Sequence, residues 1–231
     1  MKTIAIITAR GGSKRIPKKN IKEFCGKPMI AYSIEETLKS EVFDEVMVST
    51  DSEEIAEVAT KYGANVPFFR SEKTSSDFAT TDDVLLEVLG EYEKRGMKFD
   101  SMACIYPTAP FVTAEKLRKA YYILQNHEDT NMVMPAVAFS YPPQRGYVMK
   151  NQQFEMMWKE NLNKRSQDLE TIYHDCGQFY FYHVSKFMEL SGEISKGIYP
   201  IIVDELEVQD IDNETDWKLA EMKYQLMNKN S

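Results

Sequence analysis

The sequence predicts an α/β fold in a single domain over residues 1–231, built on a mostly parallel sheet with helices on both faces. Three observations lead to this prediction. Short apolar, β-branched runs alternate with amphipathic helical stretches through residue 138. The first apolar run ends at a glycine-containing loop, and open parallel sheets bind ligands at the carboxyl ends of such strands. The chain has 231 residues, of which 43% are hydrophobic and 28% charged, and this composition suits one folded domain.

The first part of the chain predicts strands and helices in regular alternation. Apolar runs that stop at turn residues indicate buried strands, and apolar residues repeated on one face indicate helices. Pro28 stands at a plausible first helical position, Asp51 or Ser52 stands at an N-cap position, and Gly63 would end that helix. In order, the predicted elements are a strand over 2–8, a helix over 28–40, a strand over 44–50, helices over 53–63 and 81–95, a strand over 101–106, a helix over 113–126 and a strand over 131–138.

The pattern changes at about residue 140. Residues 140–175 contain turn residues, aromatics and short extended pieces, without a sustained helical period. We interpret this stretch as an excursion from the main domain that lines the functional site. The elements predicted after it are return strands over 177–184 and 197–203 and a closing helix over 213–226, capped by Asn213 or Asp212.

Charge and composition exclude several classes of function. The formal net charge is −8, which argues against general nucleic-acid binding because that binding needs a broad basic face. No apolar run reaches the roughly 18 to 20 residues of a membrane span, and the apolar N-terminal run is too short for a signal peptide. We therefore expect a cytoplasmic protein with no nucleic-acid or membrane partner. Cys25, Cys104 and Cys176 are far apart in the sequence and are expected to be reduced thiols rather than a disulfide or zinc framework.

The loop after the first predicted strand concentrates positive charge. It lacks both the Gly-x-Gly-x-x-Gly and the Walker pattern, so neither a dinucleotide site nor a P-loop NTPase is indicated. Gly11 and Gly12 would let backbone N–H groups approach an anion, Ser13 adds a donor, and Lys14 and Lys19 suit triphosphate oxygens. A solvated basic turn is the alternative, but cations crowded in one loop repel one another without an anion. The five cations of residues 7–20 are Arg10, Lys14, Arg15, Lys18 and Lys19.

The loop sequence ARGGSKRIPKKN resembles the nucleotide-binding signature of the cytidylyltransferases that activate nine-carbon keto-sugar acids, the family of the CMP-sialic acid synthetases. The resemblance spans nearly the whole chain. The segment RSQDLETIYHDCGQFY, residues 165–180, is similar to the branch of this family that acts on pseudaminic acid. Further matching motifs are STD (49–51), Arg70 before SSD (75–77), ATT (79–81), PTAPF (107–111) and QDIDNETD (209–216).

This resemblance implies a fold, a reaction and a set of site residues. Family members have a Rossmann-like sheet, transfer CMP from CTP to the anomeric hydroxyl of the sugar acid, release pyrophosphate, use Mg²⁺ and commonly form homodimers through a protruding segment, here about 140–175. By resemblance, Arg10, Lys14 and Lys19 are the catalytic cations. The implied nucleotide-binding residues are Arg10, Gly11, Gly12, Ser13, Lys14, Lys19, Asn20, Arg70, Thr80 and Thr81; the substrate-binding residues are Tyr106, Gln144, Arg145, Arg165, His174 and Gln178; and the metal ligands are Asp210 and Asp212.

Several positions depart from the pattern of the sialic acid enzymes. Tyr106 replaces a glutamine that contacts the sugar, and His174 replaces an arginine; both changes favour pseudaminic acid over sialic acid as the acceptor. Gln144 and Arg145 share the place of one lysine. His174 and the two residues that follow it on the predicted strand point to opposite faces in turn, which disfavours a covalent cysteine mechanism. A sialic or legionaminic acid enzyme and a non-catalytic nucleotide-binding module stay open as alternatives.

Overall fold

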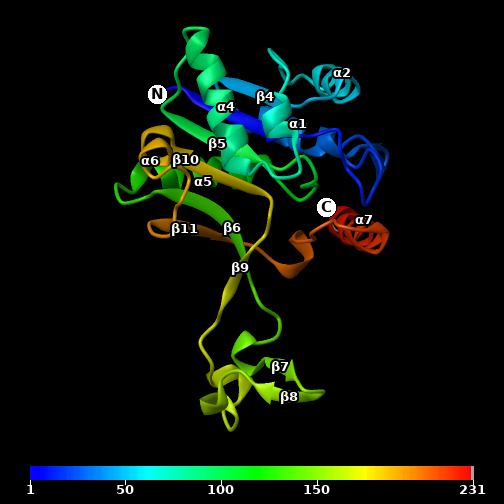
Figure 1. Ribbon diagram of the computed structural model, residues 1–231, viewed down its shortest axis with the longest axis vertical. Coiled ribbons are helices and arrows are strands. Elements are labelled where there is room, and N and C mark those ends of the chain that lie inside the picture. The colour runs from blue at the N-terminus through cyan, green and yellow to red at the C-terminus, as the bar shows by residue number, and fades with distance from the viewer. Residues whose placement is uncertain (230–231) are drawn as a thin grey trace.

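The centre of the molecule is one seven-stranded sheet, seen in the computed structural model, which describes residues 1–229 (Figure 1). The strands lie in the order β11-β6-β10-β5-β1-β4, and β9 pairs with β6 beyond this path. The strands are β1 (Thr3–Thr8), β4 (Glu45–Ser49), β5 (Ser101–Ile105), β6 (Met132–Ala138), β9 (Tyr173–Asp175), β10 (Phe179–His183) and β11 (Ile198–Ile202).

The sheet is mixed, although most of its strands share one direction. β1 is parallel to β4 and β5, and β11 is parallel to β6. β10 is antiparallel to both β5 and β6, so β6 runs in the same direction as β5. β9 is antiparallel to β6. The predicted α/β fold with a mostly parallel sheet is confirmed, with β10 and β9 as the reversed strands.

Helices cover both faces because successive residues of β1 point to opposite sides. Ala5 and Ile7 belong to one buried cluster, which includes residues of α1, α2 and α5. Ile4 and Ile6 belong to another, which includes residues of α4 and α6. These helices are α1 (Met29–Ser40), α2 (Glu53–Lys61), α4 (Thr81–Lys94), α5 (Ala114–Asn126) and α6 (Val184–Glu189); the closing helix is α7 (Glu214–Lys229).

Helix caps settle the alternatives that the sequence left open. Ser52, and not Asp51, caps α2, because its hydroxyl accepts a hydrogen bond from the Ile55 N–H at 3.4 Å. Gly63 follows that helix with φ of +95°, a left-handed conformation that glycine adopts without strain. Asn213, and not Asp212, caps α7, since its side-chain oxygen accepts from the N–H groups of Thr215 and Asp216.

The excursion at residues 140–175 protrudes from the sheet and is joined to it through β6 and β9 (Figure 1). It contains an antiparallel hairpin and three short 3₁₀ turns, in agreement with the extended pieces expected there. Among the described residues, no helix has the length and apolarity needed to cross a bilayer. The remaining short elements, most of them not predicted, are β2 (Glu23–Phe24), β3 (Lys27–Pro28), α3 (Glu72–Ser75), η1 (Pro143–Arg145), β7 (Tyr147–Lys150), β8 (Gln153–Met156), η2 (Lys159–Asn161), η3 (Ser166–Asp168) and η4 (Glu205–Glu207).

Candidate active site

Two cavities adjoin at the carboxyl ends of the parallel strands. The first, cavity A, has a volume of about 480 Å³ and lies among the β1 loop, the segment before α4 and the end of β5. The second, cavity B, has a volume of about 600 Å³ and lies among the end of β6, β9 and the segment before α7. Tyr106 and Thr108, which follow β5, line both cavities. Tyr106 and Thr108 therefore form a shared wall, beside which ligands in the two cavities would be neighbours.

Cavity A gathers the residues predicted to bind the nucleotide from three separate segments of the chain. Gly11 and Gly12 are exposed in the same loop. Tyr106 also lines this cavity, and burial raises the pKa of its hydroxyl, so the group stays neutral. The predicted residues that line cavity A are Arg10, Ser13, Lys14, Lys19, Asn20, Arg70, Thr80 and Thr81.

The β1 loop is held in place by two hydrogen bonds. The Gly11 N–H donates to the Asp51 carboxylate at 2.7 Å, and the Asn20 side-chain amide donates to the Arg10 carbonyl at 2.9 Å. A β-carbon on Gly11 would lie 3.1 Å from that of Ser52, which is tighter than most packing contacts. The close approach of this loop to the start of α2 thus suits glycine. Asp51 therefore positions the loop, whereas the sequence indicated it only as a candidate N-cap.

All five cations of the loop have a partner. Arg10 and Lys14 both contact the Asp77 carboxylate, at 2.9 and 2.5 Å. These two contacts hold the pKa of Asp77 below its usual value, with the Lys14 hydrogen bond as the main cause. The other partners are Asp212 for Arg15, Glu54 for Lys18 and the Ile211 carbonyl for Lys19, each at 2.7 Å.

Arg70 forms a buried corner of cavity A. Its Nε donates to the Ser49 hydroxyl at 3.1 Å, and a terminal nitrogen donates to the Ser49 carbonyl at 2.7 Å. Burial lowers the pKa of Arg70, and the nearby Asp51 carboxylate opposes this effect. The two contacts fix the guanidinium at the end of β4, where it adds positive charge to the cavity.

Tyr106, in the wall shared by the cavities, packs against Tyr180 of cavity B, which a carboxylate holds in place. The rings of Tyr106 and Tyr180 pack edge to face with centroids 5.6 Å apart. The Tyr180 hydroxyl donates to the Asp175 carboxylate at 2.5 Å, and the Gly177 N–H donates to the same carboxylate at 2.8 Å. Burial raises the pKa of Tyr180 above its usual value. Asp175 therefore fixes one side of the wall.

His174 and Cys176 line cavity B beside Asp175. The His174 ring lies against Phe139, with centroids 4.6 Å apart, and its Nδ1 is 2.9 Å from the Asp175 carbonyl. Cys176 is 5% exposed, and burial raises the pKa of its thiol to about 12. A thiol with such a pKa is a poor nucleophile near neutral pH, which agrees with the expectation of no covalent cysteine mechanism.

The Asp210 and Asp212 segment lies where the two cavities meet. Ile211 is 2% exposed and packs with α7, so its two neighbours in this extended segment face outward. Asp210 lines cavity B, whereas Asp212 pairs with Arg15 of cavity A. Burial lowers the pKa of Lys19 at this junction, although both aspartates oppose the effect. Two such carboxylates fit Mg²⁺, which takes one or two protein carboxylates and completes its shell with water and substrate oxygens. Among the described residues, no larger group of acidic, histidine or cysteine ligands accompanies them.

Four predicted substrate-binding residues lie outside both cavities of the single chain, three of them in the protruding segment and the fourth, Gln178, before β10. Gln144, Arg145 and Arg165 belong to the protruding segment, where they contact Glu170, Ser166 and Asp168 of the same segment. Gln178 is 3% exposed and donates to the Glu207 carbonyl at 2.6 Å, and its side-chain oxygen has no partner among the described residues. The carboxamide thus braces the turn that leads to Asp210.

Comparisons with known proteins identify the family and support the fold of this chain. The family model described as Cytidylyltransferase matches residues 4–200. The chain is 40% identical to the pseudaminic acid cytidylyltransferase of Campylobacter jejuni, over 98% of this chain and 97% of the relative. It is 33% identical to the CMP-N,N'-diacetyllegionaminic acid synthase of Legionella pneumophila, again over 98% and 97%. A solved structure of CMP:2-keto-3-deoxy-manno-octonic acid synthetase complexed with CTP, 18% identical, superposes over the whole of both chains with a TM-score of 0.72 and supports the fold. The chain belongs to the cytidylyltransferase family.

Proposed function

We propose that this cytidylyltransferase transfers CMP from CTP to the anomeric hydroxyl of pseudaminic acid and releases pyrophosphate. The observation that carries the proposal is the pair of adjoining cavities, one lined by cations and one by polar and acidic groups, with a shared wall at Tyr106. Two substrates held in such cavities have their reacting atoms side by side. The 40% identical relative that covers the full chain favours pseudaminic acid as the acceptor.

In this proposal CTP occupies cavity A. Arg10, Lys14 and Lys19 contact the phosphate oxygens, and Thr80 and Thr81 contact the cytidine part. Negative charge develops on the pyrophosphate as it leaves, and these cations stabilise it more strongly in the transition state than in the bound substrate. Asp77 must release Arg10 and Lys14 when the phosphates arrive, since one carboxylate contacts both cations in the ligand-free chain.

Asp210 and Asp212 are the residues proposed to hold Mg²⁺, between the two cavities. Bound there, the ion would supply positive charge to phosphate and acceptor oxygens. The chain itself prepares the site, because Lys19 fixes the carbonyl of the intervening Ile211. Arg15 neutralises Asp212 in the ligand-free chain and would turn to phosphate when the metal and nucleotide bind.

The sugar acid occupies cavity B in this proposal, against Tyr106 and His174. We also propose a homodimer formed through the protruding segment, which would bring Gln144, Arg145 and Arg165 toward the cavity of the partner. The support is a set of large apolar side chains exposed on this segment, which in a monomer would lie in water. They include Tyr141 (88% exposed), Phe154 (70%), Met149 (68%), Leu162 (59%) and Tyr147 (57%).

The test is a panel of nine-carbon acids assayed with CTP by pyrophosphate release. We expect the highest kcat/KM with pseudaminic acid, because a site built around particular hydrogen bonds leaves polar groups unpaired with the wrong isomer. Equal or higher kcat/KM with N-acetylneuraminic or legionaminic acid would overturn the acceptor assignment. Binding of CTP without pyrophosphate release from any acid would favour the non-catalytic alternative.

A further inference from the structure

Cavity B is rich in negative charge for a site that receives an acid. Its lining includes the carboxylates of Asp175, Glu205 and Asp210. Lys223 is the one lysine or arginine among the described residues that line it. An anionic acceptor entering this cavity meets repulsion from three carboxylates, and Lys223 is the positive charge with which the cavity lining itself can offset it.

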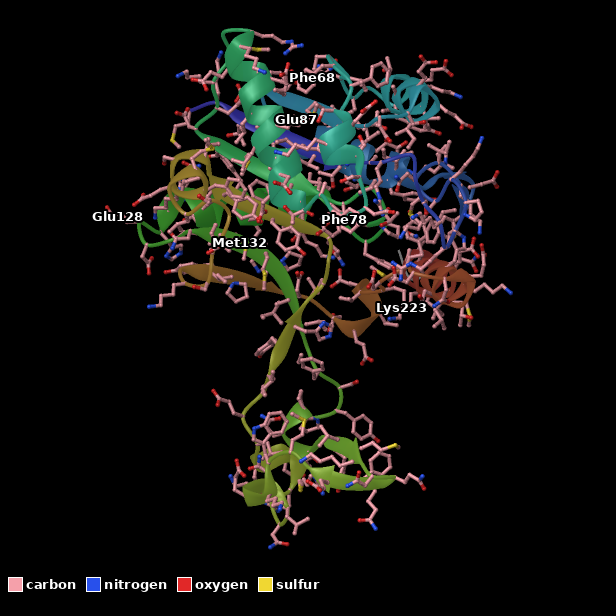
Figure 2. All side chains as sticks on the ribbon, in the orientation of Figure 1. Phe68, Phe78, Glu87, Glu128, Met132 and Lys223 are labelled. Atoms are coloured by element: carbon pink, nitrogen blue, oxygen red, sulfur yellow. The ribbon has the colours of Figure 1, made fainter. Side chains whose placement is uncertain are left out.

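Lys223 reaches the cavity from α7, where Figure 2 labels it beside the segment that follows β11. Its Nζ donates to the Val208 carbonyl at 2.6 Å and to the Glu205 carbonyl at 3.1 Å. An ammonium group has three N–H donors, so these two contacts leave one for a ligand. The half-buried side chain is thus held in one position at the wall of cavity B. A group fixed in this way binds a ligand without a large loss of side-chain entropy.

We propose that the Lys223 ammonium binds the carboxylate of the acceptor sugar acid and thereby orients the anomeric hydroxyl. The inference rests on the proposed function. In the ring form of a 2-keto-sugar acid, the carboxylate is attached to the anomeric carbon itself. When Lys223 binds that carboxylate, it restricts the orientation of the sugar ring at the anomeric carbon. The anomeric hydroxyl can then face cavity A. Lys223 acts here as a positioning residue for the nucleophile.

The experiment compares the sugar acid with its neutral primary amide at the same carbon, in the wild-type enzyme and in Lys223→Gln and Lys223→Met. Loss of one charge-assisted hydrogen bond is expected to lower kcat/KM for the acid by about 10- to 100-fold. Turnover of the amide should change by less than about threefold, because a neutral group gains little from the ammonium. The wild-type preference for the acid should therefore disappear in both variants.

A purely structural role for Lys223 predicts a different pattern. Lys223 also braces the turn at Glu205–Val208, so loss of that support alone would lower turnover of the acid and of the amide equally. An equal loss, or an unchanged preference for the acid, overturns the inference. Lys223→Gln keeps an N–H donor for the turn, and Lys218→Met, at an exposed position of the same helix, is the matched control. The dissociation constant of CTP should stay within about twofold in all variants, because Lys223 lies outside cavity A. Wild-type turnover of the acid tests the proposed function separately.

Discussion

The replacement Lys19→Met tests whether the cationic loop and the aspartate segment act as one unit. Lys19 Nζ donates to the Ile211 carbonyl at 2.7 Å, between the two proposed metal ligands. It also lines cavity A, where we propose that it contacts phosphate. Methionine has a similar length and no charge. The variant should therefore lose both stability and turnover.

The size of the stability loss follows from the contacts of Lys19. A hydrogen bond to a charged donor contributes about 1.5 to 3 kcal/mol. The lower end applies, because the side chain is half-exposed and because its partial burial carries a desolvation cost that the replacement removes. For a chain of this length, about 1.5 kcal/mol corresponds to a fall in Tm of about 3 to 6 °C. Loss of a group that faces developing charge should lower kcat by about 100-fold or more.

Lys14→Met is the matched control from the same loop. The Lys14 side chain is 77% exposed and contacts only Asp77 among the described residues. Its removal should leave Tm within about 1 °C, because exposed ion pairs contribute little to stability, while turnover still falls. Thermal unfolding and pyrophosphate release are measured on both variants. Equal Tm for Lys19→Met and the wild type would refute the structural link, and unchanged kcat would refute the phosphate contact.

The remaining predictions concern the proposed metal ligands, the Asp77 carboxylate that contacts the cationic loop, and the proposed dimer. Asp210→Asn and Asp212→Asn should each lower kcat at least about 10-fold and raise the Mg²⁺ requirement while CTP binding persists; normal turnover at low Mg²⁺ would show that the pair is only structural. Asp77→Asn should lower the Kd of CTP by about threefold in calorimetry, because it frees Arg10 and Lys14, and weaker binding would contradict this. Phe154→Glu should convert a dimer to monomers in light scattering and raise KM for the acid; an unchanged mass would exclude this interface.

Local patterns in the sequence were sufficient to predict the main elements of the fold. The strand and helix periods extend over enough residues in β1, α1, α4 and α5 to identify each element. Short elements such as α6 and η4 carry too few residues to show a period. The antiparallel direction of β10 could not be predicted from its run of aromatic residues. Side chains alternate between the two faces of a sheet in the same way in parallel and in antiparallel strands.

The lining of cavity A was predictable where its residues are close in sequence. The cationic loop combines glycines and positive charges directly after a buried strand, and that pattern points to phosphate. Asp51 and Asp77 reach the loop across 40 and 67 residues, so no local signal connects them to it. Lys223 has the appearance of a solvated lysine on an amphipathic helix. Only the packing of α7 against η4 places it in cavity B.

The charge balance of the loop explains why a chain of net charge −8 can hold five cations in one place. We expected these cations to repel one another without a ligand, yet carboxylates from three other segments and one carbonyl already contact them. Two of these carboxylates, Glu54 and Asp77, differ in whether they occupy cations inside cavity A. Glu54 holds Lys18 at α2, away from cavity A, whereas Asp77 contacts two cations inside the cavity. A triphosphate can replace one exposed carboxylate at low cost, because each exposed ion pair is weak and the phosphates carry more charge. The loop can therefore be ordered before CTP arrives and still bind it.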